Sequence, residues 1–421
     1  MVKVSVLMPV YNLEDYIEHA MESLFNQTLK DIEIVCVNDG SVDNSYEILK
    51  EFASKYDFIK VFSQENKGAG PALNKCIEEA TGEYIAFLDA DDIYVDDDAL
   101  ERMYNYAAEN DADMVAGNLK FVEGEDYKIV DSHHYKRKLY KYCDKEEIIS
   151  PDNYGIPYAF YKNIFKREFL NKNNIRFPPY KRGVDTLFLA RVLVNVEKIF
   201  TIPVWLYGYN HAVGGGFNKK LSDYDFIRNF FKVFKGVFDI FYEAGFNGVA
   251  HEFKKELLLY FRYEGNATDW GIYELVMEVY GDDGSYFTDF QDEYDVFIAT
   301  QLINHLNENP TEELYVKTKE DISNLDLSKN KEVSEYLLRK AHLLETSNSL
   351  DEFTRNYLEL NCFILEKENE KLSKKVRKLT SKNKKLKKQV KKQKKINKSL
   401  VNSSSWKLTM PLRGLKRVFK R

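Results

Sequence analysis

Three carboxylates fall within four positions at the end of an apolar run. The run Tyr84–Leu88 leads directly into Asp89, Asp91 and Asp92. Like charges at this spacing repel one another, so a chain that needed only solubility would scatter them. The ordinary alternative is the first turn of a helix, where acids favour the helix dipole, but Asp96–Asp98 just downstream suit that role. We therefore expect a positively charged ligand at the upstream acids.

The acidic run must be positioned by a sheet. Apolar runs at Val2–Met8, Ile32–Val37 and Phe58–Phe62 predict buried strands. Apolar residues at helical spacing predict helices between and after them, at Leu13–Phe25, Ser45–Phe52 and Ala72–Ala80. This alternation predicts an α/β fold with a mostly parallel sheet that is covered on both faces.

Polar, turn-forming segments follow three of the apolar runs. They are Pro9–Asn12, Asn38–Ser41 and Asp89–Asp92. Ligands of such sheets bind beyond the carboxyl ends of the strands, which meet at one edge. We expect the three segments to lie together there.

The rest of the chain predicts additional parts. With 421 residues it exceeds what one core usually serves, and a composition of 44% hydrophobic residues indicates a folded protein. Mixed strand and helix signals run to about residue 215, and from Ser222 to about Asn356 the pattern is helical and aromatic. We therefore expect an α/β domain at 1–215, an α-helical domain at 216–356, a coiled coil at 357–402 and a tail at 403–421.

Leucines recur every seven residues near the end of the chain, at Leu358, Leu365, Leu372, Leu379 and Leu386. Val and Asn fill the positions three before several of these leucines, a pattern typical of a parallel two-stranded coiled coil. A homodimer is therefore expected. Lysines flank the seam without compensating glutamates, so a single solvated basic helix is the alternative.

Charge is unevenly distributed along the chain. The net charge is −6, but residues 371–421 hold 21 Lys or Arg and no acid, which leaves −27 on residues 1–370. Such a tail meets an anionic surface or folds back on the acidic body. After residue 405, Trp406 and several aliphatic residues interleave with cations, which suits the surface of an anionic membrane. The basic run lacks interleaved aromatics before Trp406, so nucleic acid is not the expected partner.

The cysteines and the apolar runs point to a cytoplasmic protein. The four cysteines are widely spaced and form no pattern of a zinc site or a disulfide framework. No apolar run is long enough for a membrane span or resembles a secretory signal. With the basic tail, we expect a peripheral protein at the inner face of the cell membrane.

Four segments resemble, in order and spacing, the family 2 glycosyltransferases, whose nucleotide-sugar domain has the GT-A fold. They lie within residues 3–211 and contain SVLMPVYN with VNDGSVDNS, NKGAG, FLDADD and RGVDTLF. The ending SSSWKLTMPLR also resembles a tail of some bacterial and archaeal cell-surface glycosyltransferases. The resemblance implies a GT-A domain that binds a nucleotide-sugar donor.

The resemblance implies a set of nucleotide-binding residues: Pro9, Tyr11, Asn12, Asp39, Asn66, Lys67 and Asp89. Tyr11 can offer a ring face, and Asp39 can accept a hydrogen bond from a base N–H. Lys67 could meet a phosphate, although a lone loop lysine is more often solvated.

The resemblance also implies a metal. A sugar nucleotide leaves as a diphosphate, and a divalent cation is the usual means of absorbing its charge. By similarity to the family's DxD motif, Asp91 would bind Mn²⁺ or Mg²⁺, Asp89 would bind the ribose or the metal's shell, and Asp92 would support them. His211 could complete the metal shell, or it could be structural.

Asp185 matches the second acid of the family's Glu-Asp motif, implied to be the general base. It would take a proton from an acceptor hydroxyl that attacks the anomeric carbon opposite the leaving diphosphate, and this single displacement inverts the anomeric configuration. The alternative is that Asp185 caps the helix expected at Thr186–Val194.

Three positions depart from the family's pattern. Asn38 replaces an acid, Leu73 stands where an arginine is common, and Val184 replaces the first acid of the Glu-Asp motif. The expected function is transfer of a sugar from a donor, expected to be UDP-linked, to a hydroxyl of a cell-surface glycan or lipid-linked acceptor. Because of Leu73 and Val184, the alternative is a scaffold or glycan-binding protein with reduced catalysis.

Overall fold

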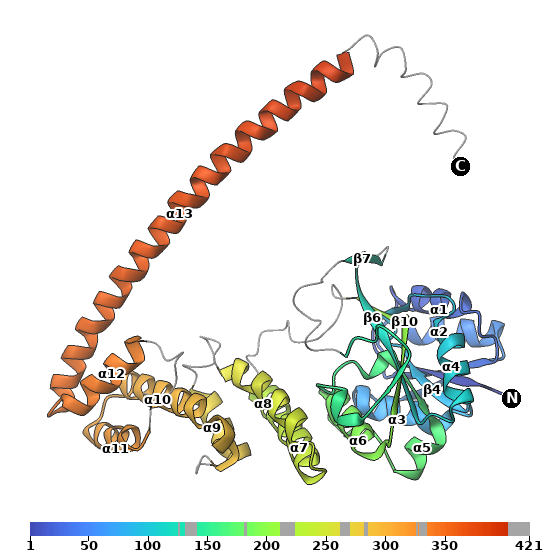
Figure 1. Cartoon of the computed structure of the whole chain (residues 1–421), viewed down its shortest axis with the longest axis horizontal. Helices are drawn as coiled ribbons and strands as arrows, with labels where there is room; N and C mark the ends of the chain where they lie inside the picture. Colours follow the sequence, from blue (N-terminus) through green and yellow to red (C-terminus); the bar gives the residue numbers. More distant parts are fainter. Residues whose placement is uncertain are drawn as a thin grey trace. The chain divides into compact units, whose positions relative to one another are not determined.

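The computed structural model describes residues 1–124, 127–130, 141–180, 183–210, 224–261, 270–281, 285–325, 327 and 335–402. Two compact units make up the chain, Met1–Gln301 and Leu302–Arg421. The first unit holds the described strands and several helices that follow them (Figure 1). It extends beyond residue 215, and the domain limits that we expect at 215, 356 and 402 stay predictions.

Strands and helices alternate at the start of the chain, as the sequence predicts. In chain order they are β1 (Val4–Val10), α1 (Ile17–Phe25), β2 (Ile32–Asp39), α2 (Ser45–Lys55), β3 (Ile59–Gln64), α3 (Ala69–Glu79) and β4 (Tyr84–Phe87). β1 pairs in parallel with β2 and with β4, and β2 pairs in parallel with β3. The carboxyl ends of these strands therefore meet at one edge of the sheet.

The later elements extend the sheet and make it mixed. They are β5 (Ile93–Tyr94), α4 (Ala99–Glu109), β6 (Met114–Glu123), β7 (Lys128–Val130), β8 (Glu147–Ile149), β9 (Asn163–Lys166), α5 (Arg167–Lys172), α6 (Val184–Asn195) and β10 (Ile199–Asn210). The sheet order is β3-β2-β1-β4-β9-β6-β10-β5, with β7 on β6 and β8 on β10. β9 lies antiparallel between β4 and β6, whereas β10 runs parallel to β6. The predicted α/β class and GT-A arrangement, a mostly parallel mixed sheet, are confirmed.

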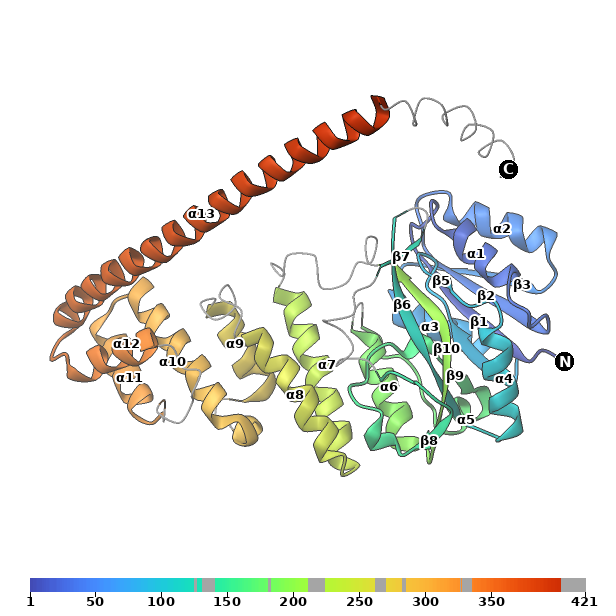
Figure 2. The same cartoon turned by 45° about the horizontal axis from the view of Figure 1, so that its top comes forward.

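Helices cover both faces of the sheet (Figure 2). On one face, Val6 and Met8 of β1 are buried in a cluster with Leu24 of α1. On the other face, the ring of Phe87 at the end of β4 lies 5.7 Å from that of Phe188 in α6. Burial on both faces explains why β1, β2 and β4 are almost continuously apolar.

A helical layer follows the sheet within the first unit. It consists of α7 (Tyr224–Glu243), α8 (Asn247–Phe261) and α9 (Trp270–Tyr280). At Gly236, α7 comes so close to α6 that an added Cβ atom would lie 3.0 Å from Cδ2 of Leu187. The hydroxyl of Tyr280 donates a hydrogen bond to the carbonyl of Phe231 at 3.0 Å, which joins α9 to α7. The aromatic residues of this region are therefore largely core residues.

The helix α10 (Gln291–Glu308) spans the division between the units, and the second unit continues with α11 (Glu312–Ser323), α12 (Glu335–Thr346) and α13 (Leu350–Asn402). Thr311 caps α11, because its hydroxyl accepts a hydrogen bond from the N–H of Leu314 at 3.2 Å. The hydroxyl of Tyr315 donates to the carbonyl of Ser347 at 2.7 Å, which joins α11 to the connection between α12 and α13.

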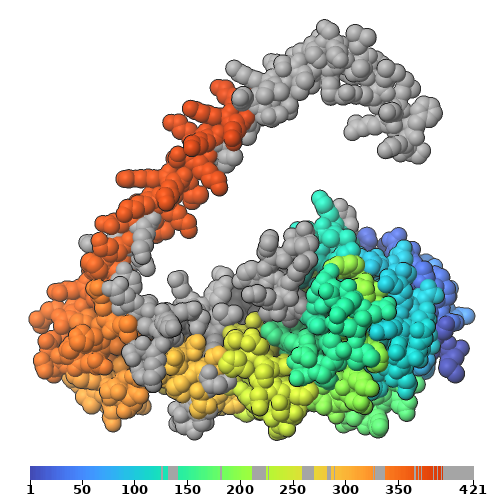
Figure 3. Space-filling model, in the orientation of Figure 1, coloured from blue at the N-terminus to red at the C-terminus, as the bar shows by residue number. Residues whose placement is uncertain are grey.

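The expected heptad segment lies on one helix of 53 residues, α13. Its leucine seam is open in the single chain, since Leu358, Leu372 and Leu379 are 56%, 56% and 58% exposed. Side chains stand out separately along the described part of this helix (Figure 3). The coiled coil and the homodimer stay predictions. Among the residues that the structure describes, no helix combines the length and apolar character that crossing a membrane requires.

Candidate active site

The acidic run forms a turn at the centre of the sheet edge. Leu88 continues the pairing of β4 with β1, because its N–H donates to the carbonyl of Leu7 at 3.0 Å. The N–H of Asp92 then donates to the carbonyl of Asp89 at 3.0 Å and closes the turn. The turn therefore starts where β4 ends, at the carboxyl edge that the sequence predicts.

The three acids of this turn have different surroundings. Asp92 is 2% exposed, and its carboxylate accepts hydrogen bonds from the hydroxyl of Tyr207 at 2.5 Å and from the N–H of Asn210 at 2.6 Å. Within the described part of the chain, the carboxylates of Asp89 and Asp91 accept no hydrogen bond from another residue. The carboxylate of Asp92 is thus hydrogen-bonded inside the domain, whereas the carboxylate oxygens of Asp89 and Asp91 are available to a ligand.

The electrostatics of the turn favour a cation. Burial, together with the nearby charges of Asp91 and Asp185, raises the pKa of Asp89 to about 7. Burial also raises the pKa of Asp91, and it raises that of Asp92 well above its usual range despite the hydrogen bonds from Tyr207 and Asn210. Partly desolvated carboxylates that repel one another are suitable ligands for a hard divalent cation.

The chain offers this cation few ligands of its own. In the described ranges, no group of three or more His, Cys, Asp and Glu side chains is arranged to hold a metal ion. Mg²⁺ is often bound by only one or two carboxylates, with substrate phosphates and water completing its shell. Asp89 and Asp91 therefore fit a cation that arrives with a diphosphate. His211, the other expected ligand, lies outside the described residues.

Asp185 lies close to the acidic turn although it is far away in the sequence. Its charge is one of the causes that raise the pKa of Asp89. Helix α6 begins at Val184 after Gly183, which has φ = 70°, so Asp185 sits in the first turn and not at the N-cap that the alternative required. Burial raises the pKa of Asp185, while its own N–H and that of Thr186 oppose the rise. The fold thus brings Asp185 near Asp89, and the roles of these acids stay predictions.

Val184 and Leu73, two residues that depart from the family's pattern, are both packed in the interior. Val184 is buried, and an added Cβ atom on Gly70 would lie 3.3 Å from its Cγ1. Leu73 is buried on α3. The side chain of Asn74 accepts from the N–H of Phe177 at 2.8 Å and donates to its carbonyl at 2.9 Å. Residues 70 to 74 thus hold the start of α3 against the segment that leads to Asp185.

Asp39 organises the loop before α3. Its Oδ1 accepts from the Nε2 atom of Gln64 at 2.7 Å and from the N–H of Lys67 at 2.9 Å, and its Oδ2 accepts from the N–H of Gly68 at 2.8 Å. A carboxylate has about four acceptor sites, so one remains for a base N–H. The base-binding role of Asp39 stays a prediction.

The other expected nucleotide-binding residues line the same edge. Pro9 lies opposite Val37 in the pairing of β1 with β2. Tyr11 is 47% exposed, so its ring is available to a base. Asn12 has φ = 53°, and its N–H donates to the hydroxyl of Ser41 at 3.1 Å. Asn12 therefore joins two of the polar segments.

The side chains of Asn66 and Lys67 are exposed. Gly40 packs against the backbone of Asn66, because a Cβ atom on Gly40 would lie 2.8 Å from the backbone nitrogen of Asn66. Whether Lys67 meets a phosphate stays a prediction.

Sequence reasoning missed the tyrosines that hold the acidic turn. Tyr207 contacts both ends of the turn, and the hydroxyl of Tyr127 donates to the carbonyl of Asp91 at 3.3 Å. Tyr207 lies in a strand with aromatics at alternate positions, Trp205 and Tyr209. That alternation predicts a strand, but it does not show which tyrosine reaches the acids.

Comparison with known proteins agrees with this arrangement. Residues 5–173 match the family model described as Glycosyl transferase family 2. A poly(ribitol-phosphate) beta-glucosyltransferase of Bacillus spizizenii is 34% identical over 215 residues, 49% of this chain and 32% of that protein. A putative glycosyltransferase of Bacillus subtilis, EpsH, is 38% identical over 210 residues, 49% of this chain and 60% of that protein. The match thus spans about a third of the first relative and three fifths of the second.

A solved structure shows the same fold. The crystal structure of S. aureus TarS 1–349 in complex with UDP-GlcNAc has a TM-score of 0.51 at 19% identity and covers 85% of this chain and 90% of that one. At this identity the likeness is one of fold. Residues 5–173, which hold most of the sheet and the acidic turn, are thus similar to the family 2 glycosyltransferases, and the fold is of the GT-A type.

Proposed function

We propose that this chain is a metal-dependent, inverting glycosyltransferase that moves a sugar from a UDP-sugar to a hydroxyl of a cell-surface glycan or lipid-linked acceptor. The observation that carries the proposal is that Asp185, in the first turn of α6, acts electrostatically on Asp89 in the acidic turn that follows β4. One acid can receive a proton while the others face the leaving diphosphate. The names of the relatives support the reaction class.

Asp185 is the proposed general base. It accepts the proton of the acceptor hydroxyl while that oxygen forms a bond to the anomeric carbon and the bond to the diphosphate breaks. Burial raises the pKa of Asp185. The carboxylate is therefore a stronger proton acceptor than a solvated aspartate, whose pKa is about 3.9.

Asp91, together with Asp89, is the proposed holder of Mn²⁺ or Mg²⁺. When bound, such an ion offsets the charge that develops on the leaving diphosphate. Without a cation the two carboxylates repel each other, and this is one reason why the pKa of Asp89 is raised.

The donor is proposed to be UDP-linked because the TarS structure of the same fold holds UDP-GlcNAc. Tyr11 offers an exposed ring, and Asp39 keeps one acceptor site for a base. The proposed sugar is a hexose or an N-acetylhexosamine.

The cellular setting is part of the proposal. We propose a cytoplasmic enzyme that is held at the inner face of the membrane by the basic tail 403–421 and is dimeric through α13. The tail's cations and apolar residues support the first point, and the leucine seam supports the second. A lipid-linked or surface-glycan acceptor fits this location.

The test is release of UDP from a panel of UDP-sugars with and without Mn²⁺. Asp185→Asn should lower turnover by roughly a hundredfold to ten-thousandfold with a much smaller effect on UDP affinity, because it removes the proton acceptor and keeps the size of the side chain. Asp91→Asn should lower turnover and weaken Mn²⁺ binding. Asp97→Asn, an exposed acid of the same stretch, is the matched control.

Full turnover by Asp91→Asn or Asp185→Asn would contradict the proposal. Calorimetry that shows donor binding by the wild type without any turnover would favour the scaffold alternative. Val184, which is buried where the family's motif has an acid, is the reason for this alternative.

A further inference from the structure

We propose that Tyr207 and Asp92 form a latch that positions the acidic turn, so that Asp89 and Asp91 present their carboxylates to the diphosphate-bound cation. The latch is defined as the hydroxyl of Tyr207, the carboxylate of Asp92 and the N–H of Asn210. The inference rests on the proposed function and adds positioning residues to its site.

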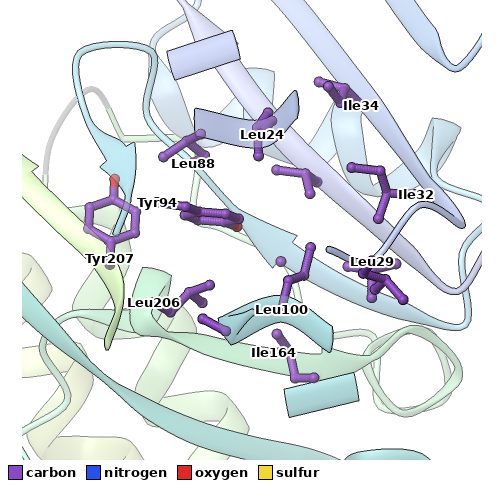
Figure 4. Packing of buried hydrophobic residues seen from close by; sticks show 14 of the residues in the cluster. Leu24, Leu29, Ile32, Ile34, Leu88, Tyr94, Leu100, Ile164, Leu206 and Tyr207 are labelled. Carbon is purple, nitrogen blue, oxygen red and sulfur yellow. The ribbon is translucent and has the colours of Figure 1, made fainter. Parts of the chain in front are cut away.

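Tyr207 is fixed by packing before its hydroxyl acts. It is fully buried on β10, where it lies opposite Leu119 of β6 and opposite Tyr94 of β5. Its ring stacks on that of Tyr161 with centroids 4.2 Å apart and lies 6.4 Å from that of Tyr94. Figure 4 shows Tyr207 beside Tyr94, close to Leu88. The position of the hydroxyl is therefore set by the strand and the rings around it.

The hydroxyl of Tyr207 joins the two ends of the acidic turn. It accepts a hydrogen bond from the N–H of Asp89 at 3.2 Å and donates one to the carboxylate of Asp92 at 2.5 Å. The N–H of Asn210, three residues further along β10, donates to the other oxygen of Asp92 at 2.6 Å. One strand thus fixes the first and the last residue of the turn.

The latch separates the three acids by role. Asp92 uses both carboxylate oxygens in the interior, which turns this acid away from a ligand. The backbone of the turn is held at the N–H of Asp89 and, through Tyr127, at the carbonyl of Asp91. The carboxylates of Asp89 and Asp91 are then the groups of the turn that can bind a cation, and these hydrogen bonds hold their backbone in place.

A Tyr207→Phe substitution isolates the latch. It removes one oxygen atom and keeps the ring that packs on Tyr161. Tyr84→Phe is the matched control, because Tyr84 is also fully buried and lies on β4, but its hydroxyl donates to the carbonyl of Ala107 at 3.2 Å and has no contact with the acidic turn. Asp92→Asn tests the other side of the latch.

The first readout needs no ligand. Amide hydrogen exchange of the full chain should be faster at Asp89 and Asp92 in Tyr207→Phe than in wild type, with little change along β1 and β2. Tyr84→Phe should leave exchange in the turn unchanged. Unchanged exchange in the turn of Tyr207→Phe would overturn the latch whatever the protein's activity.

The second readout is Mn²⁺ binding with UDP present, measured by electron paramagnetic resonance. Tyr207→Phe should weaken Mn²⁺ binding about tenfold, the effect of losing one ordinary hydrogen bond. Combining it with Asp92→Asn should cost less than the sum of the two single effects, because both act through one contact.

Tyr207→Phe that binds Mn²⁺ as tightly as wild type would also overturn the proposal, by showing that the hydroxyl serves only the fold. Wild type that binds no Mn²⁺ with UDP present would contradict the proposed function, and the exchange experiment would then still decide whether the latch exists.

Discussion

Among single residues, the acids of this domain have two kinds of role. Some are hydrogen-bonded within the protein, and others are available to a ligand. The carboxylates of Asp92 and Asp39 each accept hydrogen bonds from several donors of the protein, whereas the carboxylates of Asp89 and Asp91 accept none from another described residue. A side-chain type alone therefore does not assign a role. The partners that each carboxylate finds in the fold assign it.

Glu33 is a purely structural acid at the opposite edge of the sheet. Its carboxylate accepts hydrogen bonds from the hydroxyl of Ser5 at 2.5 Å and from the hydroxyl of Thr81 at 2.9 Å, and it pairs with Lys60 at 2.7 Å. Burial acts to raise the pKa of Glu33, but these hydrogen bonds outweigh it and lower the pKa. The ionised form is therefore stabilised in the folded protein.

Glu33→Gln should lower the free energy of unfolding by about 1.5–3 kcal/mol at pH 7, since it removes hydrogen bonds to a charged group. Because the folded pKa is lowered, this stability is present above the unfolded value of about 4.3 and is lost as the pH falls through the folded value. Urea unfolding at several pH values should show the difference from wild type shrinking below about pH 4.3. A difference that stays constant to low pH would contradict this role, and UDP affinity at pH 7 should not change.

Sequence motifs predict the acids of the candidate site but not the tyrosine that contacts them. FLDADD and RGVDTLF predict which acids matter, and the structure places Asp89 and Asp185 close together. Tyr207 could not be predicted, because its role depends on the register of β10 against β5 and β6. That register is set by long-range pairing, which no local pattern contains.

At the scale of elements, the start of α3 is fitted to the segment before α6. An added Cβ atom on Gly70 would lie 2.4 Å from the carbonyl oxygen of Pro178, a distance that requires the backbone to shift. Helix α6 carries Asp185, so this contact also sets where the proposed base lies.

Gly70→Ala should therefore destabilise the protein by about 1–3 kcal/mol, the usual cost of overpacking, and should lower turnover. Gly248→Ala is the matched control, since nothing lies within 4 Å of its added Cβ atom in α8, and alanine there should be neutral or slightly stabilising. Thermal unfolding and UDP release measure both effects. A Gly70→Ala protein as stable and active as wild type would show that the two segments are not coupled.

Apolar periodicity decides which helices and strands the sequence predicts. The strands and helices of the first part were predicted because their apolar periodicity is strong, and their observed ends differ by only a few residues. The antiparallel β9 was not predicted, because its pairing with β4 and β6 joins distant parts of the chain.

At the scale of the whole molecule, the long helix α13 is the element whose partner is still to be shown. Leu372, Val376 and Leu379 are more than half exposed at heptad spacing. Such a seam is stable in water when it is covered, and a second copy of α13 covers it in the predicted homodimer.

The variant Leu372→Lys with Leu379→Lys should convert a dimer into a monomer, measured by sedimentation of the full chain. Because lysines flank the seam, the wild-type dimer should tighten as salt rises and screens their repulsion. A wild-type chain that is monomeric at micromolar concentration and in high salt would contradict the coiled coil and favour the single basic helix.

In the proposed function, Asp91 and Asp185 act on one reaction from two sides of a bound nucleotide. The most direct measurement is anomalous scattering from a crystal of the full chain soaked with UDP and Mn²⁺. We predict a Mn²⁺ peak between the UDP diphosphate and Asp91, with Asp185 facing the same diphosphate across the strand ends. A Mn²⁺ peak away from the acidic turn, or UDP bound out of reach of Asp185, would contradict the proposed roles of Asp91 and Asp185.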